Sequence, residues 1–346
     1  MRLLFITQII DKEDDILGFI HRWIEKLSIN AEFLNAICLK KGSHCFPSNV
    51  KVWSLGKETG ESRIKYLLRF YKYIFLGDLE YDIVFIHMNP VYAVLGGLYW
   101  KARRKKIFLW YNHHYGSLLA RLAILISDKV FYTSPFSFAA KFKKSKIMPA
   151  GIDIEAFKRN SGVNRAKNSI LSVGRIAPIK KIDVLVKAAK LLDEAGLEFV
   201  LNIVGEPAAE ERPYFDEVKK LSSSLAVKGK VKFFGKLANY RTPSVYNQNE
   251  IFVNLSPSGL FDKAILEAMA CEMLTLVSSK AFESVLPNQL IFKEGDPRDL
   301  KDKIAGLFYE IPEAKQDLGR KLRDYVIQNH NLDILINKLT DEFKKA

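Results

Sequence analysis

Short apolar runs alternate with longer segments of helical periodicity along the whole chain, and this alternation limits the folds open to it. Strands separated by helices form βαβ units, whose strands are parallel. The predicted strands lie at residues 3–8, 33–38, 50–54, 82–86, 107–111, 130–133, 169–173, 199–204, 231–235, 251–255 and 274–278. The sequence therefore predicts an α/β protein built on doubly wound parallel sheets.

The length of the chain predicts more than one domain. Its 346 residues exceed what a single hydrophobic core usually organises. Proline and glycine interrupt the pattern in MPAGID (148–153), so we expect a boundary near residue 150. Two doubly wound domains facing each other across a cleft are expected, with ligands beyond the carboxyl ends of the strands.

Positive charge is concentrated in the first half of the chain. Residues 1–150 carry 23 Lys and Arg against 12 Asp and Glu, whereas residues 151–346 carry 30 against 27. This imbalance predicts an acidic partner for the first half, such as nucleic acid, a phospholipid surface or a phosphorylated acceptor. The three cysteines lack C-x-x-C spacing, and no apolar run approaches the ~20 residues of a transmembrane helix. A cytoplasmic setting is expected.

Residues 63–76, RIKYLLRFYKYIFL, predict a basic and aromatic helix. One face is expected to hold Ile64, Leu67, Leu68, Tyr71, Ile74 and Phe75. This face either packs into the core or grips an anionic membrane surface, which needs apolar residues beside cations. The runs 101–106 and 141–146 add positive charge, and no recognition module predicts binding to nucleic acid.

A candidate diphosphate site follows the predicted strand at 169–173. Gly174, Arg175 and Lys180 come just before a helix with apolar residues at i, i+3, i+4 and i+7 from Ile182. Two cations at a strand end beside a helix amino terminus can hold a diphosphate. A solvated loop is the alternative interpretation.

The segment SPSGLFDKAILEAMACEM (256–273) places one carboxylate, Glu267, in an otherwise apolar helix. A buried carboxylate is costly unless it is paired. We therefore expect Glu267 to accept hydrogen bonds from sugar hydroxyls, or else to pair with Lys263 at i, i+4. Gly259 would let the backbone approach a ligand, and the helix beginning near Phe261 or Asp262 would offer free N–H groups.

Histidines end two predicted strands in the first half. His87 ends one strand, and His113 and His114 follow another. Either neighbourhood faces the expected cleft, although a histidine in such a place is more often structural than catalytic. No metal site is predicted, because the chain has no H-x-x-x-H or cysteine cluster, and GDLEYD (77–82) is interpreted as a surface turn.

Together these motifs resemble the family 4 glycosyltransferases of the GT-B fold. The matching segments, in the family's order, are PAGIDIEAF (149–157), VGRIAPIKKIDVLVKAA (173–189), LNIVGE (201–206), VKFFGKL (231–237) and LSPSGLFDKAILEAMAC (255–271). The resemblance implies an acceptor-side domain at 1–150, a donor-binding domain at 151–329, and a final helix at about 330–346 that returns to the first domain.

The resemblance also implies an activity and roles for residues. The activity is a retaining transfer, without metal or cofactor, from a UDP- or GDP-sugar to a glycan or lipid-linked acceptor. Arg175 and Lys180 would hold the diphosphate, Glu267 the ribose, and His113 (or His114) would lie near the anomeric carbon. The other implied donor-binding residues are Gly174, Gly205, Gly235, Leu237, Gly259, Leu260, Phe261, Asp262 and Lys263. The acceptor-side candidates are His87, His114 and Gly18.

The sequence departs from the family at one carboxylate. The family's first glutamate lies eight residues before the second, and Gly259 stands there in this chain; Leu260-Phe261-Asp262 replaces the usual Gly-Phe-Gly. Because that first glutamate contacts the donor sugar, the sugar stays open, and Asp262 or Lys263 is considered as a substitute. Lys181 also replaces a glycine that often follows the phosphate-contacting lysine.

Three other functions are consistent with these observations. A sugar-nucleotide epimerase or a glycogen-type synthase would use the same two-domain scaffold. A non-catalytic nucleotide-sugar-binding protein would have lost its chemistry with the first glutamate. A nucleic-acid-binding protein is favoured by net charge alone, and we expect no nucleic acid partner.

Overall fold

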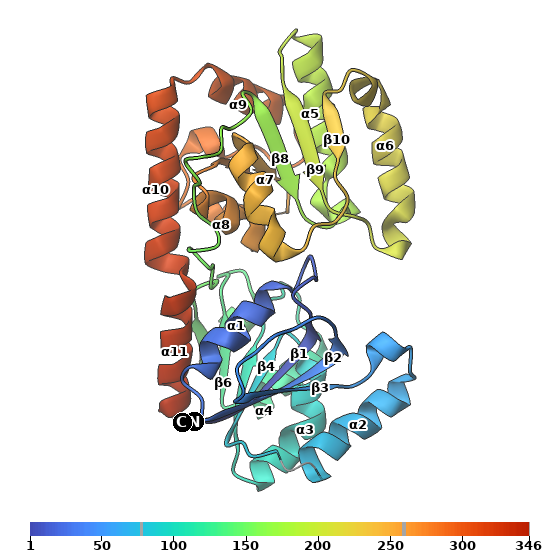
Figure 1. Ribbon diagram of the computed structural model, residues 1–346, viewed down its shortest axis with the longest axis vertical. Helices are drawn as coiled ribbons and strands as arrows, with labels where there is room; N and C mark the ends of the chain where they lie inside the picture. Colours follow the sequence, from blue (N-terminus) through green and yellow to red (C-terminus); the bar gives the residue numbers. More distant parts are fainter. Residues whose placement is uncertain (77–78, 258–260, 346) are drawn as a thin grey trace. The chain divides into compact units, whose positions relative to one another are not determined.

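The computed structural model describes residues 1–76, 79–257 and 261–345. The chain divides into two compact units, Met1–Gly151 with Leu332–Ala346, and Ile152–Asn331. They are called unit 1 and unit 2 below (Figure 1). Each unit has its own parallel sheet, as the alternating pattern predicts.

Unit 1 is built on a sheet of order β3-β2-β1-β4-β5-β6-β7, in which every pairing is parallel. Its strands are β1 (Arg2–Ile10), β2 (Phe33–Lys41), β3 (Val50–Ser54), β4 (Ile83–His87), β5 (Lys106–Trp110), β6 (Lys129–Tyr132) and β7 (Ser145–Ile147). Its helices are α1 (Phe19–Ser28), α2 (Arg63–Leu76), α3 (Pro90–Ala102), α4 (Leu118–Ile126) and α11 (Leu332–Lys344).

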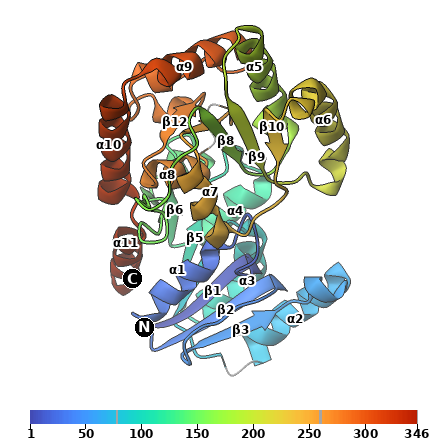
Figure 2. The same ribbon diagram turned by 45° about the horizontal axis from the view of Figure 1, so that its top comes forward.

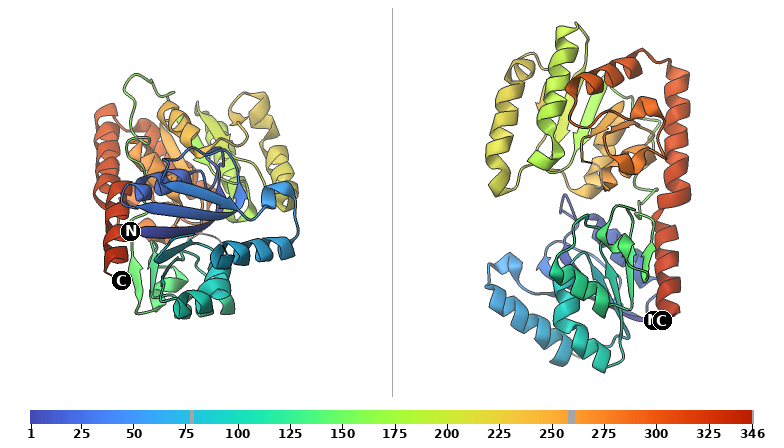
Figure 3. Two further views of the ribbon diagram at one scale, coloured as in Figure 1. Left: turned by 60° about the horizontal axis from the view of Figure 1, so that its bottom comes forward. Right: turned by 180° about the vertical axis from the view of Figure 1, so that it is seen from behind.

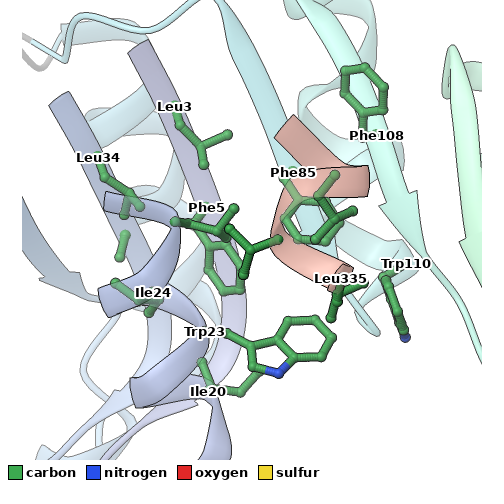
Figure 4. Packing of buried hydrophobic residues seen from close by; sticks show 14 of the residues in the cluster. Leu3, Phe5, Ile20, Trp23, Ile24, Leu34, Phe85, Phe108, Trp110 and Leu335 are labelled. Carbon is green, nitrogen blue, oxygen red and sulfur yellow. The ribbon is translucent and has the colours of Figure 1, made fainter. Parts of the chain in front are cut away.

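Helices cover both faces of this sheet. On one face, Trp23 of α1 and Leu335 of α11 pack with Phe5 and Phe85 from the strands (Figure 4). On the other face, α2, α3 and α4 cover a second core, in which Phe70 and Trp100 are fully buried. Alternate residues of β1 point to opposite faces, so Leu3 and Phe5 join the first core while Leu4 and Ile6 join the second.

Unit 2 has a smaller parallel sheet of order β10-β9-β8-β11-β12. Its strands are β8 (Ser169–Val173), β9 (Val200–Val204), β10 (Val231–Phe233), β11 (Ile251–Asn254) and β12 (Leu274–Val277). Its helices are α5 (Ile182–Glu194), α6 (Arg212–Val227), α7 (Thr242–Gln248), α8 (Lys263–Ala270), α9 (Pro297–Tyr309) and α10 (Pro312–His330). Helices α5 and α6 cover one face of the sheet, and α7 and α8 cover the other (Figure 1, Figure 2).

The predicted strands are confirmed, with small shifts at their ends. Strand β10 ends at Phe233, two residues earlier than predicted, because Gly235 turns the chain with φ 69°. Strand β7 was not predicted, since its three residues, SKI, are polar or exposed and form no apolar run. No described helix combines the length and apolar character that crossing a membrane requires.

Candidate functional site

Glycines shape the carboxyl edge of the unit 2 sheet. Gly174 directly follows β8 and Gly205 directly follows β9, and both have φ 138°. A Cβ atom on Gly205 would lie 1.9 Å from the carbonyl oxygen of Gly174, so only glycine fits there. The Gly205 N–H donates to the Gly235 carbonyl at 2.8 Å. Three of the predicted donor-binding residues therefore lie together at adjacent strand ends.

Arg175 follows Gly174 and lies at the surface of unit 2. Its Nε atom is 3.3 Å from Glu211 Oε2, and its side chain is 44% exposed. An exposed pair of this kind contributes little to stability. Arg175 is thus a cation at the carboxyl edge of the sheet, paired with the carboxylate of Glu211.

Lys180 lies at the end of a short 3₁₀ helix, just before α5. Lys181 has φ 48°, the left-handed conformation that favours glycine, which explains the family's preference at this position. Lys181 pairs with Glu294 across 2.7 Å, whereas Lys180 points toward the start of α8.

Asp262 is the partner of Lys180 and caps α8. Its Oδ2 atom accepts hydrogen bonds from the Lys180 ammonium, from Asn254 Nδ2 at 3.0 Å and from Ser256 Oγ at 3.3 Å. Its Oδ1 atom accepts from the Ala264 N–H at 3.3 Å. Burial acts to raise the pKa of Asp262, but the charge of Lys180 and these hydrogen bonds hold it below its usual value.

Glu267 lies one turn inside α8 and is 5% exposed. Asn239 Nδ2 donates to its Oε1 at 3.0 Å, and the Tyr246 hydroxyl donates to its Oε2 at 3.2 Å. A carboxylate has about four acceptor positions, so Glu267 can accept further hydrogen bonds. Sequence reasoning missed both partners because they come from other elements, at η5 (Asn239–Arg241) and on α7.

Glu267 and Lys263 interact electrostatically, as the i, i+4 interpretation predicts. Burial raises the pKa of Glu267, while the Asn239 hydrogen bond and the charge of Lys263 act to lower it. Burial also lowers the pKa of Lys263 to about 7. The negative charge of Asp262 acts to raise the pKa of Glu267, so these groups share one electrostatic environment.

The structure describes some of the remaining predicted donor-binding residues. Phe261 stacks on Phe282 with ring centroids 5.2 Å apart, and Leu237 is half-buried just after β10. Gly259 and Leu260 lie outside the described residues. Four donors hold the carboxylate of Asp262 in this structure, and its role as a substitute for the absent glutamate stays a prediction.

The acceptor-side candidates lie at strand ends in unit 1. His87 is 5% exposed, and the ring of Trp23 lies 5.6 Å away with those of Phe5 and Phe19 nearby, so aromatic packing accounts for its position. Gly18 caps the start of α1. The acceptor-side roles of His87 and Gly18 stay predictions.

His113 and His114 follow β5 and have exposed side chains. Partial desolvation lowers the pKa of His113, and His114 Nδ1 lies 3.1 Å from the Phe136 carbonyl. Asn112 holds this loop, because its Oδ1 accepts from the N–H groups of Thr133 and Ser134 at 3.0 Å. The loop therefore presents two histidines on a fixed backbone. Within the described ranges, no group of three His, Cys, Asp or Glu could hold a metal ion.

Helices α2, α3 and α4 form a distinctive surface on unit 1. Their sequences contain six Lys or Arg and no Asp or Glu. The exposed apolar residues are Ile64, Leu67, Leu68 and Phe75 on α2, Leu98 on α3, and Leu118, Leu119, Leu122 and Leu125 on α4. We call the exposed side of these three helices the cationic helical face; Figure 3 shows the ribbons of residues 63–76 and 90–126, in blue to blue-green, from two further sides.

The orientation of α2 differs from an ordinary core-facing helix. Four residues of its predicted apolar face are exposed, and the buried contact is made by Ile74 of that face and by Phe70, which lies outside it. Phe75 packs edge-on against Tyr99 of α3, with ring centroids 4.6 Å apart. The core-facing interpretation of the whole predicted face is therefore wrong, because α2 has more apolar residues than one buried stripe accommodates.

Solved structures share the fold of the complete chain. HepE of Anabaena, solved with UDP and glucose, superposes with a TM-score of 0.80 at 16% identity and covers 100% of both chains. Sucrose-phosphate synthase of Thermosynechococcus elongatus superposes with a TM-score of 0.79 at 16% identity, covering 99% of this chain and 98% of that one. These likenesses and the two parallel-sheet units define the GT-B glycosyltransferase fold.

The family follows from the sequence of unit 2. The model for glycosyl transferases group 1 matches residues 153–325, half of the chain, and the protein belongs to this family. A similar relative is the D-inositol 3-phosphate glycosyltransferase of Rhodococcus opacus, which is 33% identical over 122 residues. That match covers 34% of this chain and 27% of the relative, so it spans about a quarter of the relative's length.

Proposed function

We propose that this protein is a retaining, metal-independent glycosyltransferase that moves a sugar from a UDP- or GDP-sugar to a glycan or lipid-linked acceptor. The observation that carries the proposal is the cluster in unit 2, where Lys180 pairs with Asp262 at the amino terminus of α8 and Glu267 lies one turn further along that helix. A diphosphate needs a cation and free N–H groups, and a ribose needs a carboxylate that can accept from its hydroxyls.

In the proposed reaction, Arg175 and Lys180 stabilise the negative charge that develops on the departing nucleotide. Preorganised charge at the position of a developing charge is a large contribution to catalysis. Glu267, held by Asn239 and Tyr246, accepts hydrogen bonds from the ribose hydroxyls without having to reorient. No carboxylate is assigned as a covalent nucleophile, so the proposed displacement occurs on the front face of the sugar, through an oxocarbenium-like state, with retention.

His113 is the proposed residue beside the anomeric carbon, with His114 as the alternative. A lowered pKa keeps the His113 ring neutral near pH 7, where it can accept or donate a hydrogen bond. A neutral ring also avoids adding a positive charge next to an oxocarbenium-like state. His113→Ala is expected to lower kcat more than it raises KM for the donor.

The acceptor is proposed to be linked to lipid, with the protein working in cell-surface glycan or glycolipid synthesis at the inner face of a membrane. The cationic helical face supports this proposal, because interfacial helices combine exposed apolar residues with Lys and Arg. Leu118 and Leu125 of α4 are 75% and 63% exposed, and Arg121 lies between them. Cations near an anionic bilayer each contribute about 1 kcal/mol.

Thermal stabilisation by a panel of UDP-, GDP- and ADP-sugars and their free nucleotides tests the donor site. A ligand that binds only the folded state raises the unfolding midpoint according to its saturation. A shift with UDP or GDP compounds is expected. Absence of a shift with every compound contradicts the proposal, and binding without transfer to any acceptor favours the non-catalytic alternative.

A further inference from the structure

An acidic side chain of this chain occupies the position where the proposed site would hold an anion. The carboxylate of Asp262 accepts hydrogen bonds from the Lys180 ammonium, from two neutral side chains and from a backbone N–H in the first turn of α8. A cation, neutral donors and a helix amino terminus are the groups that bind a phosphate oxygen. The related motif has glycine at this position and so brings no charge of its own.

We infer that Asp262 is an internal competitor for the donor diphosphate: the diphosphate gains Lys180 only when the Asp262 carboxylate gives it up. This inference rests on the proposed function and concerns the same site. The Lys180 side chain is 24% exposed and that of Asp262 is 19% exposed, so the pair is largely shielded from solvent and an incoming anion meets the carboxylate beside the ammonium. Two anions held at one ammonium repel each other, which lowers the affinity for the incoming one.

The neighbours of Asp262 show that its position is specific. Asn254 ends β11, and its Nδ2 donates to Asp262 while its Oδ1 accepts from the Ser256 N–H at 3.0 Å. Ser256 accepts a hydrogen bond from Lys180 at 3.0 Å and donates one to Asp262. The strand end, the lysine and the helix cap thus form one hydrogen-bonded network, which the donor opens when it takes Lys180.

The same contacts also fit an opposite role. Asp262 would then be a positioning residue that orients Lys180 toward the donor and stays in place when the donor binds. The two roles differ in the sign of one measurable quantity. Removing the carboxylate tightens diphosphate binding if Asp262 competes, and weakens it if Asp262 positions Lys180.

Isothermal titration calorimetry with UDP, GDP and inorganic pyrophosphate tests the inference on the full chain. The variants are Asp262→Asn and Asp262→Ser, which keep a side-chain acceptor for the α8 N-cap. The matched control is Asp296→Asn, because Asp296 caps α9 through the N–H groups of Arg298 and Asp299. Both Asp262 variants are expected to bind the preferred nucleotide about tenfold more tightly or better, with the control unchanged. The gain is expected to disappear when Lys180→Met is added.

The outcomes separate the inference from the proposed function. If the wild-type protein binds UDP or GDP and both Asp262 variants bind equally or more weakly, the competitor role is wrong while the proposed function stands. If the variants bind and the wild type does not, the inference is supported. If no form binds either nucleotide, the proposed function fails and the inference fails with it. Thermal unfolding of each variant shows whether it is folded. If one of the two Asp262 variants does not fold, the nucleotide affinity of the other tests the inference.

Discussion

The two units have the same kind of parallel sheet but different carboxyl edges. In unit 2, Lys180 and Asp262 are half-buried and pair with each other, and the buried Glu267 accepts hydrogen bonds from Asn239 and Tyr246. In unit 1, His113 and His114 are exposed on a loop, and the strand-end His87 is buried among aromatic rings. The distinctive feature of unit 1 lies instead on the helices that cover one face of its sheet.

This difference indicates a division of labour between a preorganised site and a docking surface. Buried polar networks hold their geometry before a ligand arrives, because rearranging them leaves groups unpaired. Exposed apolar residues beside cations suit a broad partner such as a bilayer, which imposes no fixed geometry. If this division holds, substitutions in unit 2 should change donor binding and transfer, and substitutions in unit 1 should change attachment to a membrane.

The largest effect is expected for Arg175→Ala in unit 2. Removing a charge that stabilises the departing nucleotide should lower kcat about 100- to 1,000-fold. The free energy of unfolding should change by less than about 1 kcal/mol, because the pair with Glu211 is largely exposed. Arg212→Ala, which removes an exposed pair with Asp216, is the control. Activity near that of the wild type in the Arg175 variant would contradict the proposal that Arg175 binds the donor diphosphate.

A second comparison uses one buried carboxylate from each unit. Glu267→Gln should weaken nucleotide binding about 10- to 100-fold, because it removes charge-assisted hydrogen bonds to the ribose. Glu342 of unit 1 is 4% exposed and pairs with Lys146 across 2.8 Å and with Lys129. Glu342→Gln should destabilise the protein without changing nucleotide affinity. Calorimetric titration measures the nucleotide affinity of both variants, and thermal unfolding measures their stability. Equal losses of nucleotide affinity in the two variants would contradict the prediction.

Attachment to a membrane should depend on unit 1. Leu118→Ser with Leu125→Ser should lower the partition into vesicles of phosphatidylglycerol and phosphatidylcholine by about tenfold or more, because each leucine loses apolar burial. Val227→Ser in unit 2 is the control, since Val227 is 90% exposed outside this face. Vesicle sedimentation at low and high salt measures the partition. Retention of the double variant at low salt would show that α4 does not contact the bilayer.

The last prediction concerns the pH dependence of stability in unit 2. Lys263 has a folded pKa of about 7 against 10.5 for an ordinary lysine. Between pH 7 and 10.5 the Lys263 amine is protonated in the unfolded chain but largely neutral in the folded one. The free energy of unfolding therefore rises with pH in this range, by at most about 1.4 kcal/mol per pH unit. Lys263→Gln should reduce the rise between pH 7 and 10. Denaturant unfolding checks this, with Lys187→Gln as the exposed control; an unchanged slope argues against burial of Lys263.

The sequence by itself determined the sheet architecture of both units. Strand positions such as 82–86 and 169–173 followed from short apolar runs, because parallel strands covered on both faces need apolar residues throughout. It also marked Arg175, Lys180 and Glu267, since each stands out from its local pattern. Strand β7 was not predicted, because its three residues are polar or exposed and show no alternation of apolar and polar side chains.

Only the tertiary structure decided which partner each marked residue has. Asn239 and Tyr246 reach Glu267 from positions 28 and 21 residues away in sequence, and Asp262 reaches Lys180 across 82 residues. Local periodicity predicts whether a segment is a helix or a strand and which of its faces is buried. It does not predict which strand ends lie next to each other in the sheet. Burial of α2 through Phe70 and Ile74, with Ile64 and Leu68 left outside, was likewise set by packing against α3. Contacts between distant segments depend on the folded chain as a whole, and the pairing of charges depends on those contacts.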